Sequence, residues 1–135
     1  MSATMSATDN AELVRRGYAA FNAADIATLT ELFDARASWH TPGRSPIAGD
    51  YVGRDAAFAQ FGRYGAETNG TFQAELLEVL ADDEGHVVGI HRNTGERNGK
   101  RLDVGCCIVF KLEDGRLVDG REHFFDLHAW DEFWS

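Results

Sequence analysis

Glu122 is a titratable side chain in a predicted strand where it could perform acid–base chemistry. Side chains two positions apart share a strand face, so Glu122 shares its face with Val118, Gly120 and Phe124. If this largely apolar face lines a cavity, burial favours the neutral carboxyl, which suits a general acid or a proton shuttle. The alternative is an exterior glutamate paired with a nearby arginine, and the sequence leaves both interpretations open.

His91 is the second candidate, because it lies in the middle of an apolar strand pattern over residues 87–92. Histidine exchanges protons near neutral pH, so an inward-facing His91 could do so with a substrate or with Glu122. That orientation would also place Asn93 on the cavity wall. The opposite parity would place Ile90 inside and His91 outside. Both faces are partly apolar, so the sequence is compatible with either orientation.

The chain lacks the motifs of several other catalytic classes. It has no His-x-His, HExxH or Cys-x-x-Cys spacing, so we expect no metal site. It also lacks a glycine-rich phosphate loop, a serine nucleophile elbow and a dinucleotide fingerprint, so we expect no cofactor. Cys106 and Cys107 are adjacent and would point to opposite faces of a strand, which disfavours a disulfide between them. This cysteine usage favours a reducing cytoplasm.

Length and charge limit the class of protein. The chain has 135 residues, enough for one ordinary domain, and its net charge of -9 disfavours partners such as nucleic acid or an anionic membrane. No apolar run approaches the roughly 18 residues that cross a bilayer, and the first residues lack the features of a secretory signal. We expect residues 1–8 to be a disordered tail and residues 9–135 to form a single domain.

Hydrophobic periodicity predicts helices followed by a long β-meander. Helical spacing and capping residues predict three N-terminal helices, over about 9–22, from Asp25 onward and over about 54–66. Alternation and the turn pairs Asn98-Gly99 and Asp114-Gly115 predict strands over 36–41, 71–81, 86–97, 100–113 and 116–126. Residues 42–53 predict a loop, and residues 127–135 have helix-like spacing. This order is typical of an α+β domain whose curved antiparallel sheet packs on three helices and encloses a conical cavity.

Five short motifs, in this order, resemble the SnoaL-like branch of the nuclear transport factor 2-like superfamily. They are Phe21-Asn22-Ala23-Ala24-Asp25, Leu32-Phe33, Trp39-His40-Thr41-Pro42-Gly43, Gly53-Arg54-Asp55-Ala56 and Asp114-Gly115-Arg116-Leu117-Val118. The resemblance covers about residues 9–135 and implies a cone-shaped, cystatin-like α+β roll. The branch includes ketosteroid isomerases, limonene epoxide hydrolases and polyketide cyclases, so the fold does not determine the activity.

Comparison with these relatives excludes some reactions and indicates one carboxylate. The positions of the isomerases' tyrosine, general base and protonated acid fall at Gly17, Thr41 and near Ile108, so their chemistry is not expected. Arg121-Glu122 is similar to the Arg-Asp pair of the epoxide hydrolases, which implies an acid–base role for Glu122. The hydrolases' Arg-x-Asp on the preceding strand is replaced here by residues 91–93, His-Arg-Asn, a departure that disfavours epoxide hydrolysis.

The resemblance implies a cavity for a small apolar molecule. We expect its walls to include Tyr18, Trp39, Phe58, Phe61 and Phe124. Strand parity places His40 outside, whereas a twist of the strand before Pro42-Gly43 would place it at the rim. Three functions stay open: a cofactor-independent isomerase, cyclase or hydrolase using Glu122 assisted by His91, a non-catalytic carrier, or an assembly module with a filled cavity. A cavity of a few hundred cubic ångströms with both Glu122 and His91 at its wall would favour the enzyme, and a filled cone would favour the assembly module. The aromatic residues after Leu127 would close the cone or pack against a second subunit, and we expect a homodimer.

Overall fold

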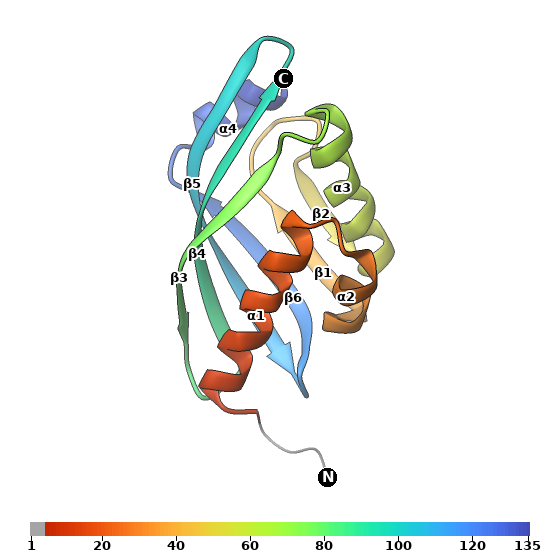
Figure 1. The fold of residues 1–135 in the computed structure, drawn as a ribbon, viewed down its shortest axis with the longest axis vertical. Helices are drawn as coiled ribbons and strands as arrows, with labels where there is room; N and C mark the ends of the chain where they lie inside the picture. Colours follow the sequence, from red (N-terminus) through yellow and green to blue (C-terminus); the bar gives the residue numbers. More distant parts are fainter. Residues whose placement is uncertain (1–4) are drawn as a thin grey trace.

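The computed structural model describes residues 5–135, which form four helices and six strands (Figure 1). The helices are α1 (Ala7–Asn22), α2 (Ile26–Leu32), α3 (Arg54–Glu67) and α4 (Leu127–Trp134). The strands are β1 (Phe33–Thr41), β2 (Gly49–Val52), β3 (Gln73–Ala81), β4 (His86–Arg97), β5 (Lys100–Glu113) and β6 (Arg116–Phe124). No helix among the described residues is long and apolar enough to cross a membrane.

The first two helices begin at side chains that cap them. Ser6 Oγ accepts a hydrogen bond from the backbone N–H of Asp9, so α1 starts two residues before the predicted position. Ala7 and Thr8, predicted to be part of a disordered tail, are therefore helical; residues 1–4 of that tail lie outside the described residues. Asp25 caps α2 as expected, because its carboxylate accepts the backbone N–H of Thr28.

The sheet has the strand order β2-β1-β6-β5-β4-β3 and is mixed rather than wholly antiparallel. The meander from β3 to β6 is antiparallel, as predicted, but β1 pairs in parallel with β6. The chain between β1 and β6 contains α3 and three strands of the meander, and such a long connection permits parallel pairing. The predicted loop over 42–53 contains β2, which pairs with the end of β1.

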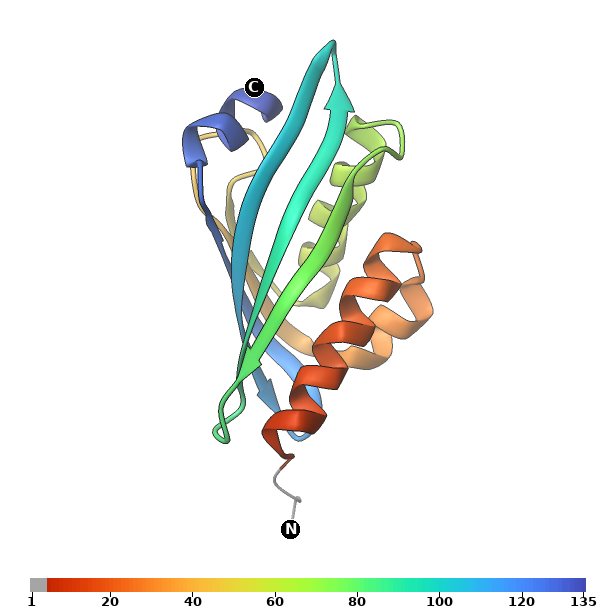
Figure 2. The ribbon, with the colours of Figure 1, turned by 60° about the vertical axis from the view of Figure 1, so that its left-hand side comes forward.

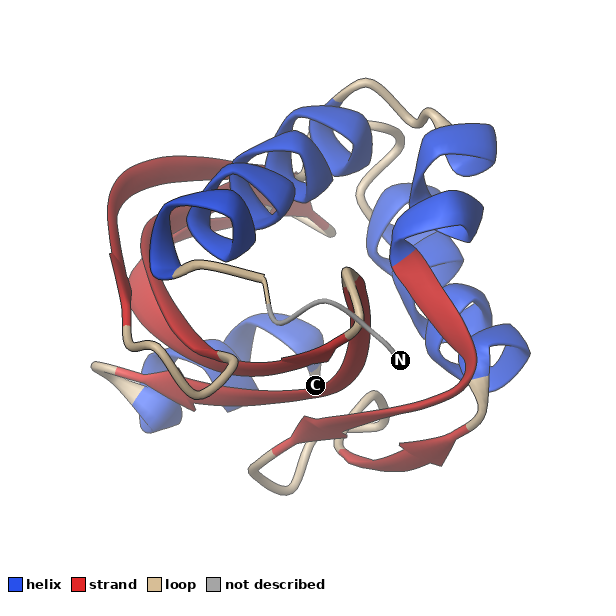
Figure 3. Cartoon of the chain, turned by 90° about the horizontal axis from the view of Figure 1, so that it is seen from below, coloured by secondary structure: helices blue, strands red, loops and turns tan. Residues whose placement is uncertain are grey.

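The expected α+β architecture is confirmed, with a curved, unclosed sheet. Figures 2 and 3 show the strands bending around a space that α1, α2 and α3 cover on one side. At one end of this space, α4 buries Trp130, Phe133 and Trp134 within the same chain. Trp130 stacks on Phe124 of β6 with ring centroids 3.9 Å apart, so the C-terminal aromatic residues close that end of the cone.

Candidate functional site

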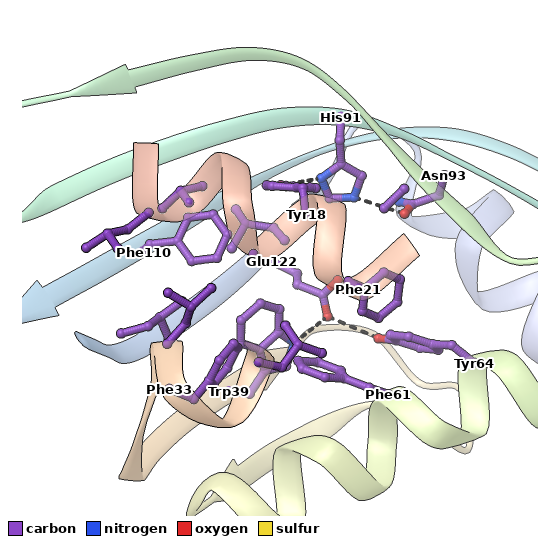
Figure 4. Close-up of a pocket in the computed structure, with 18 of the residues that line it drawn as sticks. Tyr18, Phe21, Phe33, Trp39, Phe61, Tyr64, His91, Asn93, Phe110 and Glu122 are labelled. Carbon is purple, nitrogen blue, oxygen red and sulfur yellow. Dashed lines mark hydrogen bonds between the residues drawn. The ribbon is translucent and has the colours of Figure 1, made fainter. Parts of the chain in front are cut away.

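A cavity lies between the inner face of the sheet and helices α1, α2 and α3 (Figure 4). Twenty residues line it, and those with polar side-chain atoms are Tyr18, Trp39, Tyr64, His91, Asn93 and Glu122. The cavity volume, measured as the space open to the centre of a water molecule, is about 70 Å³. On this measure a volume of about 10–15 Å³ is enough to hold one water. The cavity is therefore smaller than the few hundred cubic ångströms that would have favoured an enzyme, and it fits a compact molecule.

Glu122 is buried in the cavity wall, with 4 % of its surface exposed. Its Oε1 accepts hydrogen bonds from Trp39 Nε1 at 3.0 Å and Tyr64 Oη at 3.1 Å (Figure 4). It also accepts one from Thr41 Oγ1 at 2.5 Å. Burial raises the pKa of the Glu122 carboxyl, and this effect exceeds the opposite effect of the three hydrogen bonds. The neutral carboxyl is therefore more favoured here than in an exposed glutamate.

One strand and one helix bring these donors to Glu122. Because β1 lies beside β6 and pairs Trp39 with Gly120, both Trp39 and Thr41 point inward next to the carboxyl. A Cβ atom at Gly120 would overlap the Trp39 ring, so glycine is required for the indole to lie across β6. Tyr64 reaches the same oxygen from α3.

Gln60 fixes the orientation of one of these donors, the Thr41 hydroxyl. Its Nε2 donates to Thr41 Oγ1 at 2.6 Å and to the backbone oxygen of Ile47 at 3.2 Å. A hydroxyl has one proton, and because the Thr41 oxygen accepts from Gln60, that proton is directed to Glu122 Oε1. The carboxyl is thus held in one orientation by side chains from two separate segments, β1 and α3.

His91 lies on the inner face of β4 and is 2 % exposed. Its Nε2–H donates to Asn93 Oδ1 at 2.9 Å, and its Nδ1 accepts the Tyr18 hydroxyl at 2.7 Å (Figure 4). Burial lowers the pKa of His91 from 6.5 to about 4, so the ring is neutral at pH 7. A Cβ atom at Gly89 would lie 2.7 Å from the Tyr18 oxygen, so glycine makes room for this hydroxyl. Since both ring nitrogens are occupied, His91 acts on the cavity by holding Tyr18.

The structure brings together five of the residues selected from the sequence. Those that line the cavity are Tyr18, Trp39, Phe61, His91 and Glu122. Of the two strand parities that the sequence allowed for Glu122 and His91, the structure has the inward one in both cases. The remaining three selected residues lie elsewhere.

Phe58 and Phe124 do not line the cavity, contrary to expectation. Phe58 is half-buried on α3 and packs against Phe33, with ring centroids 5.2 Å apart. Phe124 follows the inward parity of β6, but its ring is covered by Trp130 of α4. Both aromatic side chains therefore support the cavity without contacting its space.

His40 does not lie at the rim of the cavity. Because Trp39 and Thr41 point inward from β1, the residue between them points to the outer face. There His40 Nδ1 lies 2.6 Å from Asp50 Oδ1, and its Nε2 lies 2.7 Å from Asp119 Oδ1. His40 thus links β1 to its two neighbouring strands.

Val118 also differs from the alternation predicted for β6. A β-bulge lies between β5 and β6, where Lys111 pairs with Asp119 but Leu112 pairs with Leu117. Val118 is the extra residue, and Leu117 lines the cavity in its place. Simple alternation along the strand could not predict this change, because a bulge depends on the partner strand.

Tyr64 and Thr41 are donors to Glu122 that the sequence did not indicate. Both bind Glu122 Oε1. A signal for Tyr64 was present, since it follows Ala57 and Gln60 at helical spacing, and all three residues are buried. Nothing local to Thr41 identifies its partner, which lies 81 positions later in the chain.

A group of possible metal ligands lies outside the cavity. Among the described residues, Asp82, Glu84 and His86 have ligand atoms within 4.8 Å of one another, and all three are exposed. Asp82 already accepts hydrogen bonds from the backbone N–H groups of Glu84 and His86 and lies 3.0 Å from His86 Nδ1. These contacts are those of the β3–β4 turn, and none of the three residues lines the cavity.

The chain is similar to known proteins over most of its length. Residues 14–120 match the family model of the SnoaL-like domain. The uncharacterized protein Rv0034 of Mycobacterium tuberculosis is 35% identical over 130 residues, which cover 95% of this chain and 99% of that protein.

Solved structures share the fold. Bal32a, from a soil-derived mobile gene cassette, is 73% identical with a TM-score of 0.94, and the match covers 96% of this chain and 98% of Bal32a. An NTF2-like protein from Burkholderia xenovorans is 19% identical with a TM-score of 0.82, covering 98% of this chain and 100% of that one, a likeness of fold alone. The chain therefore belongs to the SnoaL-like domain family.

Proposed function

We propose that the protein binds a compact, mostly apolar small molecule and acts on it without a cofactor, as an isomerase, cyclase or hydrolase. The observation that carries this proposal is one buried carboxyl, Glu122, in a cavity whose other lining residues are mainly apolar. Burial moves the pKa of this carboxyl toward neutral pH, and an acid–base catalyst is most effective when its pKa is near the working pH. Glu122 is the acid or base of the proposed reaction.

His91 is a positioning residue in this proposal. It is neutral at pH 7, and its two nitrogens are bonded to Tyr18 and Asn93. It therefore holds the Tyr18 hydroxyl in place on the cavity wall and does not itself exchange a proton with a ligand. This arrangement leaves Glu122 as the one carboxyl among the lining residues.

A non-catalytic carrier is the second candidate function. The occupied nitrogens of His91 favour it, because they leave the cavity without a second free acid or base at neutral pH. A carrier would use the same apolar walls and would need only the hydrogen bond of Glu122 to orient its ligand.

Replacing Glu122 by glutamine separates the two candidates. In an enzyme, E122Q is expected to lower turnover about a hundredfold and to leave ligand affinity nearly unchanged, because glutamine has the same shape but no acidic proton. Compact cyclic ketones, epoxides and alkenes are first screened for an increase in melting temperature, and each binder is then assayed for conversion. The matched control is E113Q, at an exposed glutamate near the end of β5. Conversion by E122Q at the wild-type rate would remove the carboxyl from the mechanism.

We also infer that a second copy of this chain packs on the outer face of the sheet. In the middle of that face Val88 pairs with Val109 and Ile90 pairs with Cys107, and all four are only half-buried. Leu80, on the neighbouring strand β3, is 55% exposed. Contiguous apolar side chains of this kind mark protein interfaces.

Val109→Lys is expected to convert a homodimer into a monomer, because it would bury an unpaired charge in the proposed interface. Analytical ultracentrifugation of the variant at several concentrations measures this change. Val52→Lys is the matched control, since Val52 is 77% exposed on the edge strand β2. An unchanged dimer in Val109→Lys, or a monomeric wild type, would exclude this face as the interface.

The cysteines support a cytoplasmic location, which we also propose. Both are free thiols, and Cys106 is buried while Cys107 is half-buried. As neighbours in β5 they face opposite sides of the sheet, and proteins of oxidising compartments more often pair their cysteines.

A further inference from the structure

The two oxygens of the Glu122 carboxyl have different surroundings. Oε1 accepts from the Trp39 indole, the Thr41 hydroxyl and the Tyr64 hydroxyl. An indole N–H can only donate, and the Thr41 proton is directed to Oε1 because the Thr41 oxygen accepts from Gln60. Oε1 is thus an acceptor for three donors, and an acidic proton on the same oxygen would compete with them.

Oε2 makes no hydrogen bond within residues 5–135. Six buried side-chain polar atoms among these residues lack a partner and are sealed from open space, and Oε2 is not one of them. Since Glu122 is itself buried and lines the cavity, the open space that Oε2 contacts is the cavity. A proton carried by Glu122 therefore belongs on Oε2 and points toward a ligand.

No positively charged side chain among the residues that line the cavity compensates an ionised Glu122. The titratable groups that face it are Tyr18 on α1, Tyr64 on α3, His91 on β4 and Cys106 on β5; α2 and β1 contribute no titratable side chain. Burial raises the pKa of both tyrosines and of the Cys106 thiol, and it lowers the pKa of His91. All four are neutral at pH 7, and no lysine or arginine lines the cavity.

We propose that Glu122 presents a protonated carboxyl to the cavity through Oε2, and that the ligand is an uncharged molecule whose carbonyl, ether or epoxide oxygen accepts this proton's hydrogen bond. This inference rests on the proposed function, since it names the class of ligand for the same cavity. The donor on Oε2 has no other partner within residues 5–135, so a ligand oxygen would satisfy it.

Charged ligands fit this cavity poorly. A carboxylate ligand would meet no cation among the lining residues and would lie beside the neutral hydroxyl groups of Tyr18 and Tyr64 in an apolar space. An ammonium ligand would have to lose its hydration and would also require Glu122 to lose its proton. The limited volume further restricts the ligand to a compact molecule, about the size of a single ring.

The first measurement uses the free protein. The infrared spectrum at pH 7 is expected to show the carbonyl band of a protonated carboxyl that disappears in E122Q and persists in E113Q. Carbon-13 NMR of labelled glutamate carboxyls follows the same group across the pH range. If Glu122 titrates like an exposed glutamate and is ionised at pH 7, the inference is overturned, whatever binds in the cavity.

The second measurement compares three probes that share a six-membered ring: cyclohexanone, cyclohexylammonium and cyclohexanecarboxylate. Calorimetry at pH 7 is expected to show that cyclohexanone binds at least tenfold more tightly than either charged probe. E122Q keeps a donor and should retain this affinity, whereas Glu122→Leu should lower it about tenfold, the effect of one hydrogen bond.

The outcomes distinguish this inference from the proposed function. Preference for cyclohexylammonium or cyclohexanecarboxylate would overturn the uncharged ligand class and leave the binding cavity intact. If no probe of any charge binds, the proposed ligand-binding function loses its support, while the infrared result still decides the protonation of Glu122.

Discussion

Replacing Gly120 by alanine is expected to lower the free energy of unfolding by about 3 kcal/mol and to break the hydrogen bond between Trp39 and Glu122. The new Cβ atom would overlap the six-membered part of the Trp39 ring, which is rigid. The indole cannot move aside easily, because it packs against Phe61, with centroids 5.0 Å apart, and against Phe110, with centroids 6.0 Å apart. Urea unfolding measures the loss of stability, and tryptophan fluorescence reports the displaced ring.

Gly62→Ala is the matched control for this substitution. Gly62 lies on the exposed side of α3, and a Cβ atom there would have no neighbour within 4 Å. Alanine in a helix is favoured over glycine, so this variant should gain up to about 1 kcal/mol. If Gly120→Ala is as stable as the wild type and still binds cavity ligands, the close packing of Trp39 across β6 is not required for the site.

Buried His91 is expected to make the protein less stable in acid. Its pKa is lowered from 6.5 to about 4 in the folded protein, so between these pH values the unfolded chain takes up a proton and the folded protein does not. The stabilisation is fully present above pH 6.5 and is lost as the pH falls to about 4. At about 1.4 kcal/mol per pH unit, the loss is about 3 kcal/mol.

The measurement requires a background in which Glu122 does not titrate. The raised pKa of Glu122 changes stability with pH in the opposite direction to the lowered pKa of His91. Protonated Glu122 stabilises the fold, and this contribution is lost as the pH rises from 4.5, the usual pKa of a glutamate, through the raised pKa. Urea unfolding of E122Q is therefore compared with E122Q/H91Q between pH 7 and pH 4. The difference should shrink by about 3 kcal/mol as the pH falls. The control is E122Q/H123Q, which replaces an exposed histidine in the same background. If the stability difference between E122Q and E122Q/H91Q does not change with pH, the lowered pKa of His91 is contradicted.

Local chemistry predicted the meander with accurate boundaries. Strands β4 and β5 begin and end at the predicted residues because Asn98-Gly99 forms the tight turn between them, with φ values of 51° and 75°. Two positive φ angles are what a two-residue hairpin turn requires, and this pair of residues adopts them readily. Strand β2 was missed because it is only four residues long and lies between glycines in a segment that contains both prolines.

By itself, the sequence determined most of the elements, their order, the family and two candidate site residues, Glu122 and His91. Periodicity and turn residues act over a few positions, so they can be recognised without coordinates. Only the tertiary structure decided that both side chains face inward, since the sequence left the orientation of each strand open. It also decided that β1 lies beside β6, which brings Trp39 and Thr41 to a carboxyl more than 80 positions away. Such contacts arise from the packing of distant segments, and no local pattern of residues encodes which segments meet.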